Sequence, residues 1–211
     1  MADAELIREL AAEIDKRLKR SRTPVPIGVS NRHAHITAEH FAAIFGRGAV
    51  LTSLRDLSQP GQFAANERID IVGPKGTIRN VRLLGPFRAK TQIEISMTEA
   101  VALGGKPPVR ESGDLAGSSA LQLVGPQGTV AVREGLILSR RHLHCSSSEA
   151  AAIGLANGET VRVRVGRGGG RETVFEQTVV RVSDKFSLEL HLDTDEANAA
   201  GVKNGDLAYI V

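Results

Sequence analysis

The sequence predicts a mainly β protein made of two related units of short strands, with one amphipathic helix in front of them. Short runs rich in Val, Ile and Leu are separated by turns that contain glycine, and two motifs occur twice along the chain. Regularly spaced short strands with such turns between them are typical of small barrels or sandwiches. The turns are expected at residues 73–76, 125–128, 157–158, 166–170 and 204–205.

The first element is an amphipathic helix over residues 3–20. Apolar side chains recur there every three or four residues, acidic residues begin the segment and basic residues end it, as the helix dipole favours. Pro24 and Pro26 cannot continue a helix, so residues 21–26 are predicted to be a linker. Such a helix either packs on its own domain or docks to a partner surface.

Short helices are predicted between the strands, over residues 38–46, 147–154 and 195–200. We expect them to end at Gly46, Gly154 and Gly201, because glycine readily adopts the left-handed backbone found at helix C-caps.

Two motifs are repeated. Residues 30–37 (SNRHAHIT) are echoed by residues 139–146 (SRRHLHCS), and residues 72–78 (VGPKGTI) are echoed by residues 124–130 (VGPQGTV). Each histidine motif is followed within a few residues by a predicted helix. The first histidine motif precedes its turn motif, whereas the second turn motif precedes the second histidine motif. From this order we infer two related β units with a shared site rather than a solenoid.

Composition narrows the classes of function. The 211-residue chain carries a net charge of +3, which suits a small anionic partner. It has one Tyr, six Phe and no Trp, so few aromatic side chains could stack on nucleic-acid bases and no such partner is expected. No apolar stretch approaches the roughly 20 residues of a membrane span, and no signal peptide is visible. The single cysteine, Cys145, excludes an internal disulfide and favours a reducing, cytoplasmic location.

Five of the six histidines point to a metal. Two His-x-His pairs place both imidazoles on one face of a strand, where they can reach one ion or two adjacent ions. Imidazole is the commonest protein ligand for metals, and a structural role explains two copies of this pattern poorly. The candidates are His33, His35, His142, His144 and His191, whereas His40 lies outside both motifs and is interpreted as a surface or core histidine.

The pairs need further ligands, because catalytic zinc usually has three protein ligands and an open position. His191 and Glu94 each lie within an apolar, strand-like segment. A carboxylate in such a segment is costly unless it is paired or bound to metal. Glu189 shares a face with His191 and competes with Glu94 as the carboxylate, while an ion pair with Arg88 is the alternative reading of Glu94.

Neighbouring residues suggest weaker roles. Cys145, Arg32 and Arg141 alternate to the opposite face from the histidines, so Cys145 is expected to fill the core and both arginines to lie outside the barrels. Arg88, six residues before Glu94, is a candidate phosphate anchor because the guanidinium fork binds phosphate through two hydrogen bonds.

Taken together, the motifs resemble the PduL-type phosphotransacylases, the phosphate propanoyltransferases of propanediol utilisation in bacterial microcompartments. The segments that carry the resemblance are residues 25–37, 85–96, 139–144 and 191–200. The resemblance implies two small β-barrels capped by short helices, the first of them discontinuous in sequence. It places the N-terminal helix at 1–22, barrel 1 at 23–50 and 134–211, and barrel 2 at 51–133.

The resemblance also implies a site with two zinc ions and coenzyme A as a substrate. It makes His33, His35, Glu94, His142, His144 and His191 the metal ligands. Arg88 becomes the catalytic phosphate contact, and Arg181 a second phosphate contact. The expected coenzyme A contacts are Ser30, Arg55, Arg82, Leu84, His191 and Asn198.

The expected reaction is reversible transfer of an acyl group, propanoyl or acetyl, from coenzyme A to phosphate by direct attack, with the zinc ions stabilising the developing negative charges. Residues 3–20 could dock to a microcompartment shell or to enzymes of its lumen, and a homo-oligomer is expected. Two alternatives remain open: a two-metal hydrolase of thioesters or phosphoesters, and a basic barrel that binds ligands and is stabilised by zinc.

Overall fold

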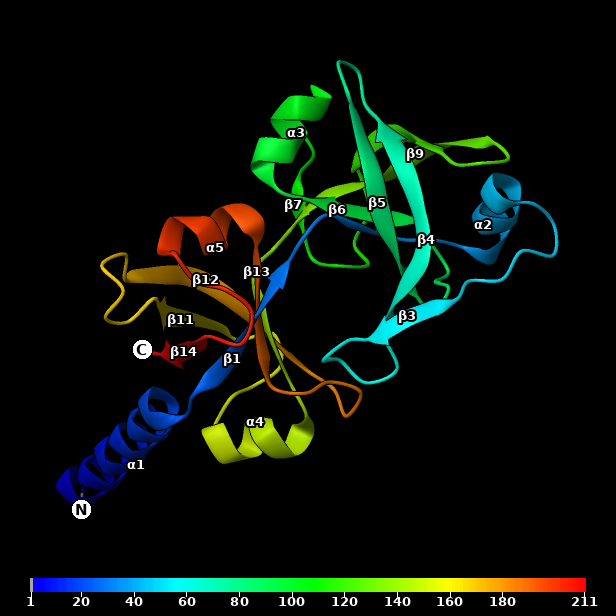
Figure 1. The fold of residues 1–211 in the computed structure, drawn as a ribbon. Coiled ribbons are helices and arrows are strands. Elements are labelled where there is room, and N and C mark those ends of the chain that lie inside the picture. The colour runs from blue at the N-terminus through cyan, green and yellow to red at the C-terminus, as the bar shows by residue number, and fades with distance from the viewer. Residues whose placement is uncertain (1) are drawn as a thin grey trace. The chain divides into compact units, whose positions relative to one another are not determined.

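The fold is described from a computed structural model that covers residues 2–211. The described chain divides into two compact units, one made of residues 2–29, 141–192 and 196–211, and the other of residues 30–140 and 193–195. It is mainly β, with two barrels, short capping helices and an N-terminal helix, as predicted (Figure 1). The first unit is discontinuous in sequence, since its chain leaves at Val29 and returns at Arg141.

The predicted boundary at residue 50 differs from the structure. Residues 30–50 were assigned to barrel 1. In the described part of the chain, however, the strand β2, His33–His35, pairs with two strands of the second unit and with none of the first. The chain therefore passes from one unit to the other between β1 and β2. The return to the first unit comes at Arg141, after the predicted boundary at 134, because the long strand β9 belongs to the second unit as far as Ser139.

The first unit contains a closed six-stranded barrel in the order β1-β13-β10-β12-β11-β14. Its apolar core includes Ile27, Leu143, Val163 and Leu190, which are all at most 1% exposed. The strands of this barrel are β1 Val25–Ser30, β10 His142–Cys145, β11 Thr160–Val165, β12 Thr173–Val182, β13 Glu189–Asp193 and β14 Leu207–Ile210. Its helices are α1 Ala2–Arg22, α4 Ser147–Ile153 and α5 Thr194–Ala200.

The second unit also closes on itself. Its sheet runs β3-β4-β5-β2-β6-β9-β7, and β8 pairs with both β4 and β9, which completes a ring of six strands. The strands are β2, β3 Ser53–Asp56, β4 Phe63–Val72, β5 Thr77–Gly85, β6 Gln92–Ile95, β7 Val109–Arg110, β8 Ser119–Val124 and β9 Thr129–Ser139. The helices are α2 Ala38–Phe45 and α3 Met97–Leu103.

Three short helices begin with side-chain caps. Thr37 accepts the His40 backbone N–H at α2, while Ser96 at α3 and Ser146 at α4 form capping boxes with the glutamate three residues later. Helices α2, α4 and α5 were predicted. Helix α3 was missed, although Ser96-Met-Thr-Glu99 is a capping-box sequence that could have revealed it.

The repeated glycine turns have equivalent contacts within the second unit (Figure 1). The turn between β4 and β5 donates the Lys75 N–H to the carbonyl of Leu103 at the end of α3, at 3.0 Å. The turn between β8 and β9 donates the Gln127 N–H to the carbonyl of Ile44 at the end of α2, at 2.9 Å. Each turn therefore satisfies a carbonyl that the helix itself leaves without a partner.

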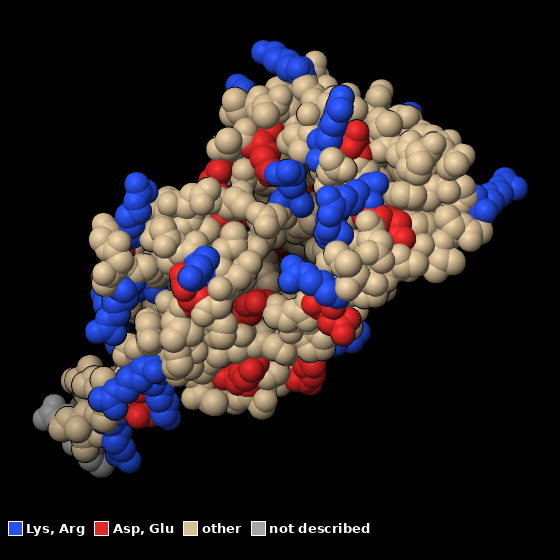
Figure 2. Space-filling view, viewed as in Figure 1, with Lys and Arg blue, Asp and Glu red and all other residues tan. Residues whose placement is uncertain are grey.

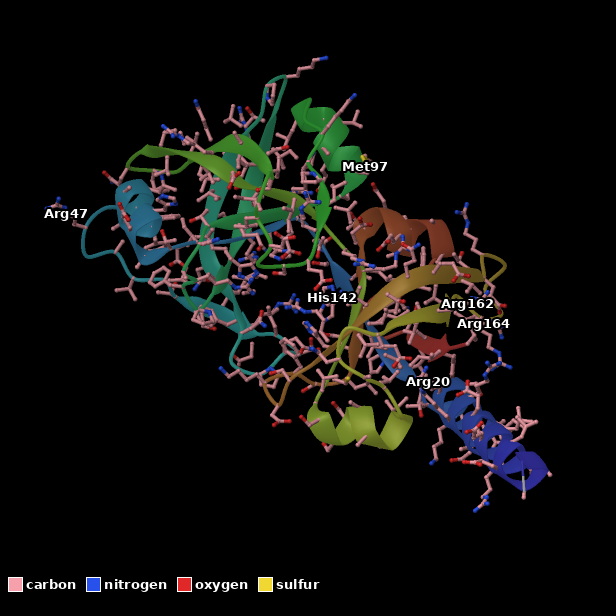
Figure 3. All side chains as sticks on the ribbon, turned by 180° about the vertical axis from the view of Figure 1, so that it is seen from behind. Arg20, Arg47, Met97, His142, Arg162 and Arg164 are labelled. Atoms are coloured by element: carbon pink, nitrogen blue, oxygen red, sulfur yellow. The ribbon has the colours of Figure 1, made fainter. Side chains whose placement is uncertain are left out.

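Helix α1 extends beyond residues 3–20, the segment that the apolar periodicity predicts. It continues through Arg22, and Pro26 already lies within β1, so the predicted linker at 21–26 shrinks to Thr23 and Pro24. Arg20, which is labelled in Figure 3, joins the helix to the barrel. Its guanidinium donates to the carbonyl of Gly154 and forms an ion pair with Glu159. Residues 4–15 are all exposed, and the described helices include none long and apolar enough to cross a membrane.

Candidate metal centre

A first group of three donor side chains lies on β2 and β6 of the second unit. These strands are antiparallel, and His33 lies directly opposite Glu94. His35, two residues along β2, projects from the same face. One ligand atom from each of the three residues lies within 4.8 Å of the other two, and the three side chains are buried. The Nε2 atom of His33 is 3.6 Å from Oε1 of Glu94.

The electrostatics of this group favour a bound cation. Burial opposes ionisation of Glu94, but His33, through charge and a hydrogen bond, and then His35, hold the pKa of this carboxyl well below its ordinary range. Burial, followed by repulsion from His33 and Arg88, holds the pKa of His35 well below its ordinary value. A buried carboxylate beside a neutral imidazole is a suitable ligand set for a divalent ion.

Hydrogen bonds on the far side of the rings agree with that chemistry. The Nδ1–H of His33 donates to the carbonyl of Asn31 at 2.8 Å, which leaves Nε2 as the ring atom that faces Glu94 and could bind a metal ion. Burial would lower the pKa of His33, but the Glu94 carboxylate raises it above its ordinary value. The Nδ1 atom of His35 is buried and has no hydrogen-bond partner among residues 2–211. A metal ion would satisfy such an atom.

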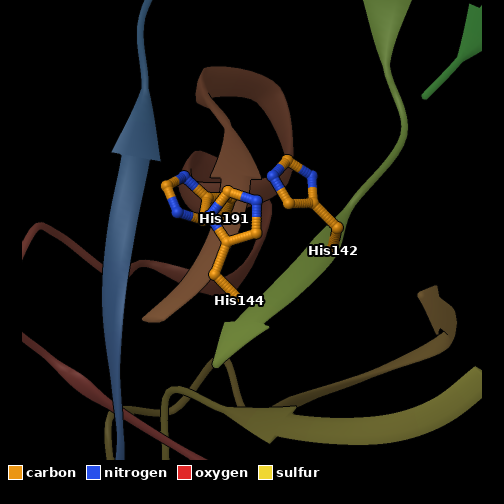
Figure 4. A group of neighbouring side chains, drawn as sticks. All are labelled: His142, His144 and His191. Atoms are coloured by element: carbon orange, nitrogen blue, oxygen red, sulfur yellow. The ribbon is translucent and has the colours of Figure 1, made fainter. Parts of the chain in front are cut away.

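A second group lies in the barrel of the first unit (Figure 4). His142 and His144 project from β10, and His191 lies on β13 directly opposite His142. The rings of His142 and His191 stack with centroids 4.7 Å apart and planes 6° apart, and the rings of His144 and His191 have centroids 4.7 Å apart. One ring nitrogen from each histidine lies within 4.8 Å of the other two.

Glu189, the alternative carboxylate, contacts this second group. It lies opposite His144 in the β10–β13 register, and its Oε2 atom is 3.1 Å from Nε2 of His191. A Cβ atom at Gly28 would lie 2.8 Å from the Glu189 carboxyl carbon, so the glycine leaves room for this buried side chain. Glu94 and Glu189 therefore belong to different groups. That both groups serve one centre stays a prediction.

Arg88, the predicted phosphate contact, is joined to the first group by two residues that the sequence interpretation missed. Its Nη1 atom donates to Ser112 Oγ at 3.1 Å. The buried Gln92 donates from Nε2 to the same Ser112 oxygen at 2.8 Å and to Glu94 Oε1 at 2.5 Å. The spacing of Gln92 and Glu94 on one strand face could have indicated Gln92. Ser112 lies in a loop and has no comparable signal.

The remaining predicted substrate contacts fall in both units. Ser30, Arg55, Arg82 and Leu84 lie in the second, where Arg82 is the cross-strand neighbour of His33 on β5. Burial and repulsion from Arg68 and Arg55 lower the pKa of Arg82, so three guanidinium groups lie close together. Arg181 and Asn198 lie in the first unit, Arg181 beside His144 on β12 and Asn198 exposed on α5.

The side chains on the opposite faces lie as expected. Cys145 is buried in the core of the first barrel, and burial raises the pKa of its thiol to about 11. Arg32 and Arg141 form ion pairs at the surface with Glu99 and Glu196. His40 is half-buried, with Nδ1 2.8 Å from Thr91 Oγ1. Figure 2 shows basic and acidic side chains interspersed over the visible surface.

The fold and the site define a protein of two β-barrels, each with a group of three nitrogen or oxygen donors, of which only His191 is partly exposed. A family model described as phosphate propanoyltransferase matches residues 26–203. Curated proteins named "Phosphate propanoyltransferase" are similar over nearly the whole chain. The protein from Thermotoga maritima is 47% identical over 92% of this chain and 92% of its own, and that from Priestia megaterium 49% identical over 97% and 93%.

The chain therefore belongs to the phosphate propanoyltransferase family. It is a phosphotransacylase, an enzyme of the acyltransferase class. The relative from Lachnoclostridium phytofermentans, 45% identical over 98% of this chain and 97% of its own, carries the same name.

Proposed function

We propose that the chain interconverts an acyl-coenzyme A, propanoyl or acetyl, and phosphate with an acyl phosphate and free coenzyme A. The observation that supports the proposal is the link from Arg88 through Ser112 and Gln92 to Glu94. It connects a guanidinium, which is suited to phosphate, to a group of residues that could hold a metal ion. The names of the relatives support the same acyl transfer to phosphate.

The two donor groups fit zinc. Imidazole nitrogen and carboxylate oxygen are ordinary zinc ligands, and each group offers three of them, as catalytic zinc sites do. His33, His35 and Glu94 would hold one ion, and His142, His144 and His191 the other. When bound, zinc supplies a Lewis acid that polarises oxygen atoms and stabilises developing negative charge.

The side chains of the chain then bind and orient the reactants. Arg88, with Arg181 as a second contact, would neutralise phosphate charge and direct one phosphate oxygen at the thioester carbonyl carbon. A carbon–oxygen bond forms and the carbon–sulfur bond breaks, and the sulfur leaves with its electron pair as the coenzyme A thiolate. No covalent enzyme intermediate is required. The buried, weakly acidic Cys145 is an unsuitable nucleophile.

Arginines on the second unit suit the phosphates of coenzyme A. Arg55 and Arg82 come from β3 and β5, and their mutual repulsion would be relieved by an anionic ligand. Ser30 and Leu84 complete the proposed contacts in this unit, and His191 and Asn198 supply those in the other.

A thiol-release assay tests the reaction. The purified enzyme is given propanoyl-coenzyme A or acetyl-coenzyme A, with and without phosphate, and free thiol and acyl phosphate are measured. Acyl transfer requires thiol release that depends on phosphate and yields acyl phosphate in equal amount. Phosphate-independent release would identify a hydrolase instead, and binding without release would identify a binding barrel; either result overturns the proposal.

Helix α1 supports a proposal about partners and location. Its apolar side chains Leu6, Ile7, Leu10, Ile14 and Leu18 are between 43% and 65% exposed. We propose that residues 3–20 dock to a microcompartment shell or to lumen enzymes, with the enzyme in the lumen and able to form a homo-oligomer. Residues 1–22 fused to a fluorescent protein should co-purify with assembled shells. A fusion with Leu10 and Ile14 changed to Glu should not, and equal recovery of both would refute the docking.

A further inference from the structure

The orientation of the Gln92 side-chain amide follows from one backbone contact. The Gly113 N–H donates to Gln92 Oε1 at 2.7 Å, and a backbone N–H can only donate. The atom that faces Gly113 is therefore the amide oxygen, and the NH₂ group faces Ser112 and Glu94. Both of its hydrogens are used, one toward the Ser112 hydroxyl and one toward the Glu94 carboxylate.

The Ser112 hydroxyl oxygen therefore accepts two hydrogen bonds. Arg88 Nη1 and Gln92 Nε2 both donate to its oxygen, and neither can accept a hydrogen bond from it. A hydroxyl has two lone pairs and one hydrogen, so both lone pairs are occupied and the hydrogen must point elsewhere. No acceptor for it is found among residues 2–211, and Ser112 is only partly buried, so a ligand can reach it.

We propose that the Ser112 hydroxyl donates a hydrogen bond to the phosphate that is held by Arg88. The inference rests on the proposed function, because it assumes that Arg88 contacts phosphate. The ionised oxygens of phosphate can only accept hydrogen bonds, so they complement the Ser112 hydroxyl, which has one hydrogen left to donate. Ser112 Oγ lies 3.1 Å from Arg88 Nη1, close enough for neighbouring oxygens of one phosphate to accept from both.

Gln92 is the residue that positions Ser112. Its amide holds the hydroxyl oxygen on one side and the backbone of Gly113 on the other, so the loop residue is fixed to strand β6 from two directions. The same amide donates a hydrogen bond to Glu94. The position of the Ser112 hydroxyl is therefore coupled to the group formed by His33, His35 and Glu94.

Calorimetric titration of the full-length enzyme with inorganic phosphate tests the proposal without relying on turnover. Ser112→Ala should weaken phosphate binding roughly 10- to 100-fold, the value of one hydrogen bond to a charged group. Ser112→Thr, which keeps the hydroxyl, should restore most of it. Ser119→Ala is the matched control, because this serine lies a few residues further on, at the start of β8. The Ser119→Ala enzyme should bind phosphate with the affinity of the wild type.

A double-mutant cycle separates contact from positioning. If Ser112 touches phosphate, Ser112→Ala should weaken phosphate binding in the Arg88→Ala background as well. If the serine acts only by holding Arg88, its substitution should have no effect there, and the proposal is overturned. Unchanged affinity of the single Ser112→Ala variant, with metal content and unfolding midpoint intact, overturns it too.

Failure of the proposed Ser112 contact can be distinguished from failure of the proposed function. If the wild-type enzyme releases no thiol in response to phosphate, the proposed reaction is wrong. If the wild-type enzyme does release thiol in response to phosphate, but Ser112→Ala binds phosphate as tightly as the wild type, the proposed reaction stands and the proposed role of Ser112 is wrong.

Discussion

His142 and His191 lie opposite each other on antiparallel strands, just as His33 lies opposite Glu94 in the other barrel. Both groups are therefore built in the same way. A His-x-His strand supplies two donors, and an antiparallel neighbour supplies the third opposite the first histidine. A shift of one residue in either strand pairing would turn the third donor to the other face of the sheet.

This construction predicts that each group controls one metal ion. His191→Ala should lower the zinc content from about two ions per chain to about one, because two imidazoles without the third hold zinc weakly. Elemental analysis of the purified enzyme measures the change. His40→Gln, the matched control outside both groups, should keep the wild-type content. Equal loss of metal in both variants would contradict the assignment.

Arg88→Ala should lower turnover roughly 100- to 1000-fold, the scale observed when a charged or preorganised donor to a developing anion is removed. Zinc content should stay at the wild-type value, because Arg88 belongs to neither donor group. Arg79→Ala, at an exposed arginine on β5, removes the same charge and should leave turnover unchanged. Wild-type turnover in the Arg88 variant would remove this residue from the mechanism.

Glycines of the repeated turns should be intolerant of a side chain. A Cβ atom at Gly76 would lie 2.3 Å from the Ala102 carbonyl oxygen, and one at Gly128 would lie 2.6 Å from that of Ala43. Each Gly→Ala substitution should cost roughly 1–3 kcal/mol in the free energy of unfolding, measured by denaturant titration. At Gly105 the nearest atom would be 3.7 Å away, so Gly105→Ala should stay within about 0.5 kcal/mol of the wild type.

The contact between α1 and the barrel should weaken in acid. Burial opposes ionisation of Glu159, but hydrogen bonds from Arg20 and the Ala156 N–H outweigh it and lower the pKa of Glu159 below its ordinary value of 4.5. A carboxyl group whose pKa is lowered by folding stabilises the folded state at pH values above its ordinary pKa. This stabilisation is lost as the pH falls through the lowered pKa.

Glu159→Gln should therefore reduce the unfolding midpoint at pH 7, and the difference from the wild type should shrink as the pH drops below 4.5. Glu13→Gln, at an exposed i,i+4 pair within α1, provides the comparison and should change the midpoint little. A difference between wild type and Glu159→Gln that stays constant with pH would show that the carboxylate charge is not responsible.

Local patterns predicted much of the fold and the site. The two-residue spacing of His33 and His35, and of His142 and His144, requires only the alternation of a strand, and the structure brings each pair together. The capped helices α2 and α4 follow from Thr37 and Ser146 in the same local way.

Long-range pairing was harder to foresee. Nothing in the sequence near Glu94 says that β6 pairs with β2, and nothing near His191 says that β13 pairs with β10. The six candidate ligands were therefore predicted as one set, and only the strand registers divide them into two groups of three. The same limitation explains the misplaced boundary at residue 50, since the partners of β2 are strands β5 and β6, far along the chain.

The division of the chain has a consequence for the order of folding during synthesis. Val25 pairs with Ala208, so the first barrel cannot close until synthesis has passed strand β14 and that strand has left the ribosome. The second unit has all its strands once Ser139 has been made. Because domains tend to fold as soon as their segments emerge, the interrupted barrel should be the slower of the two and should leave β1 exposed in nascent chains.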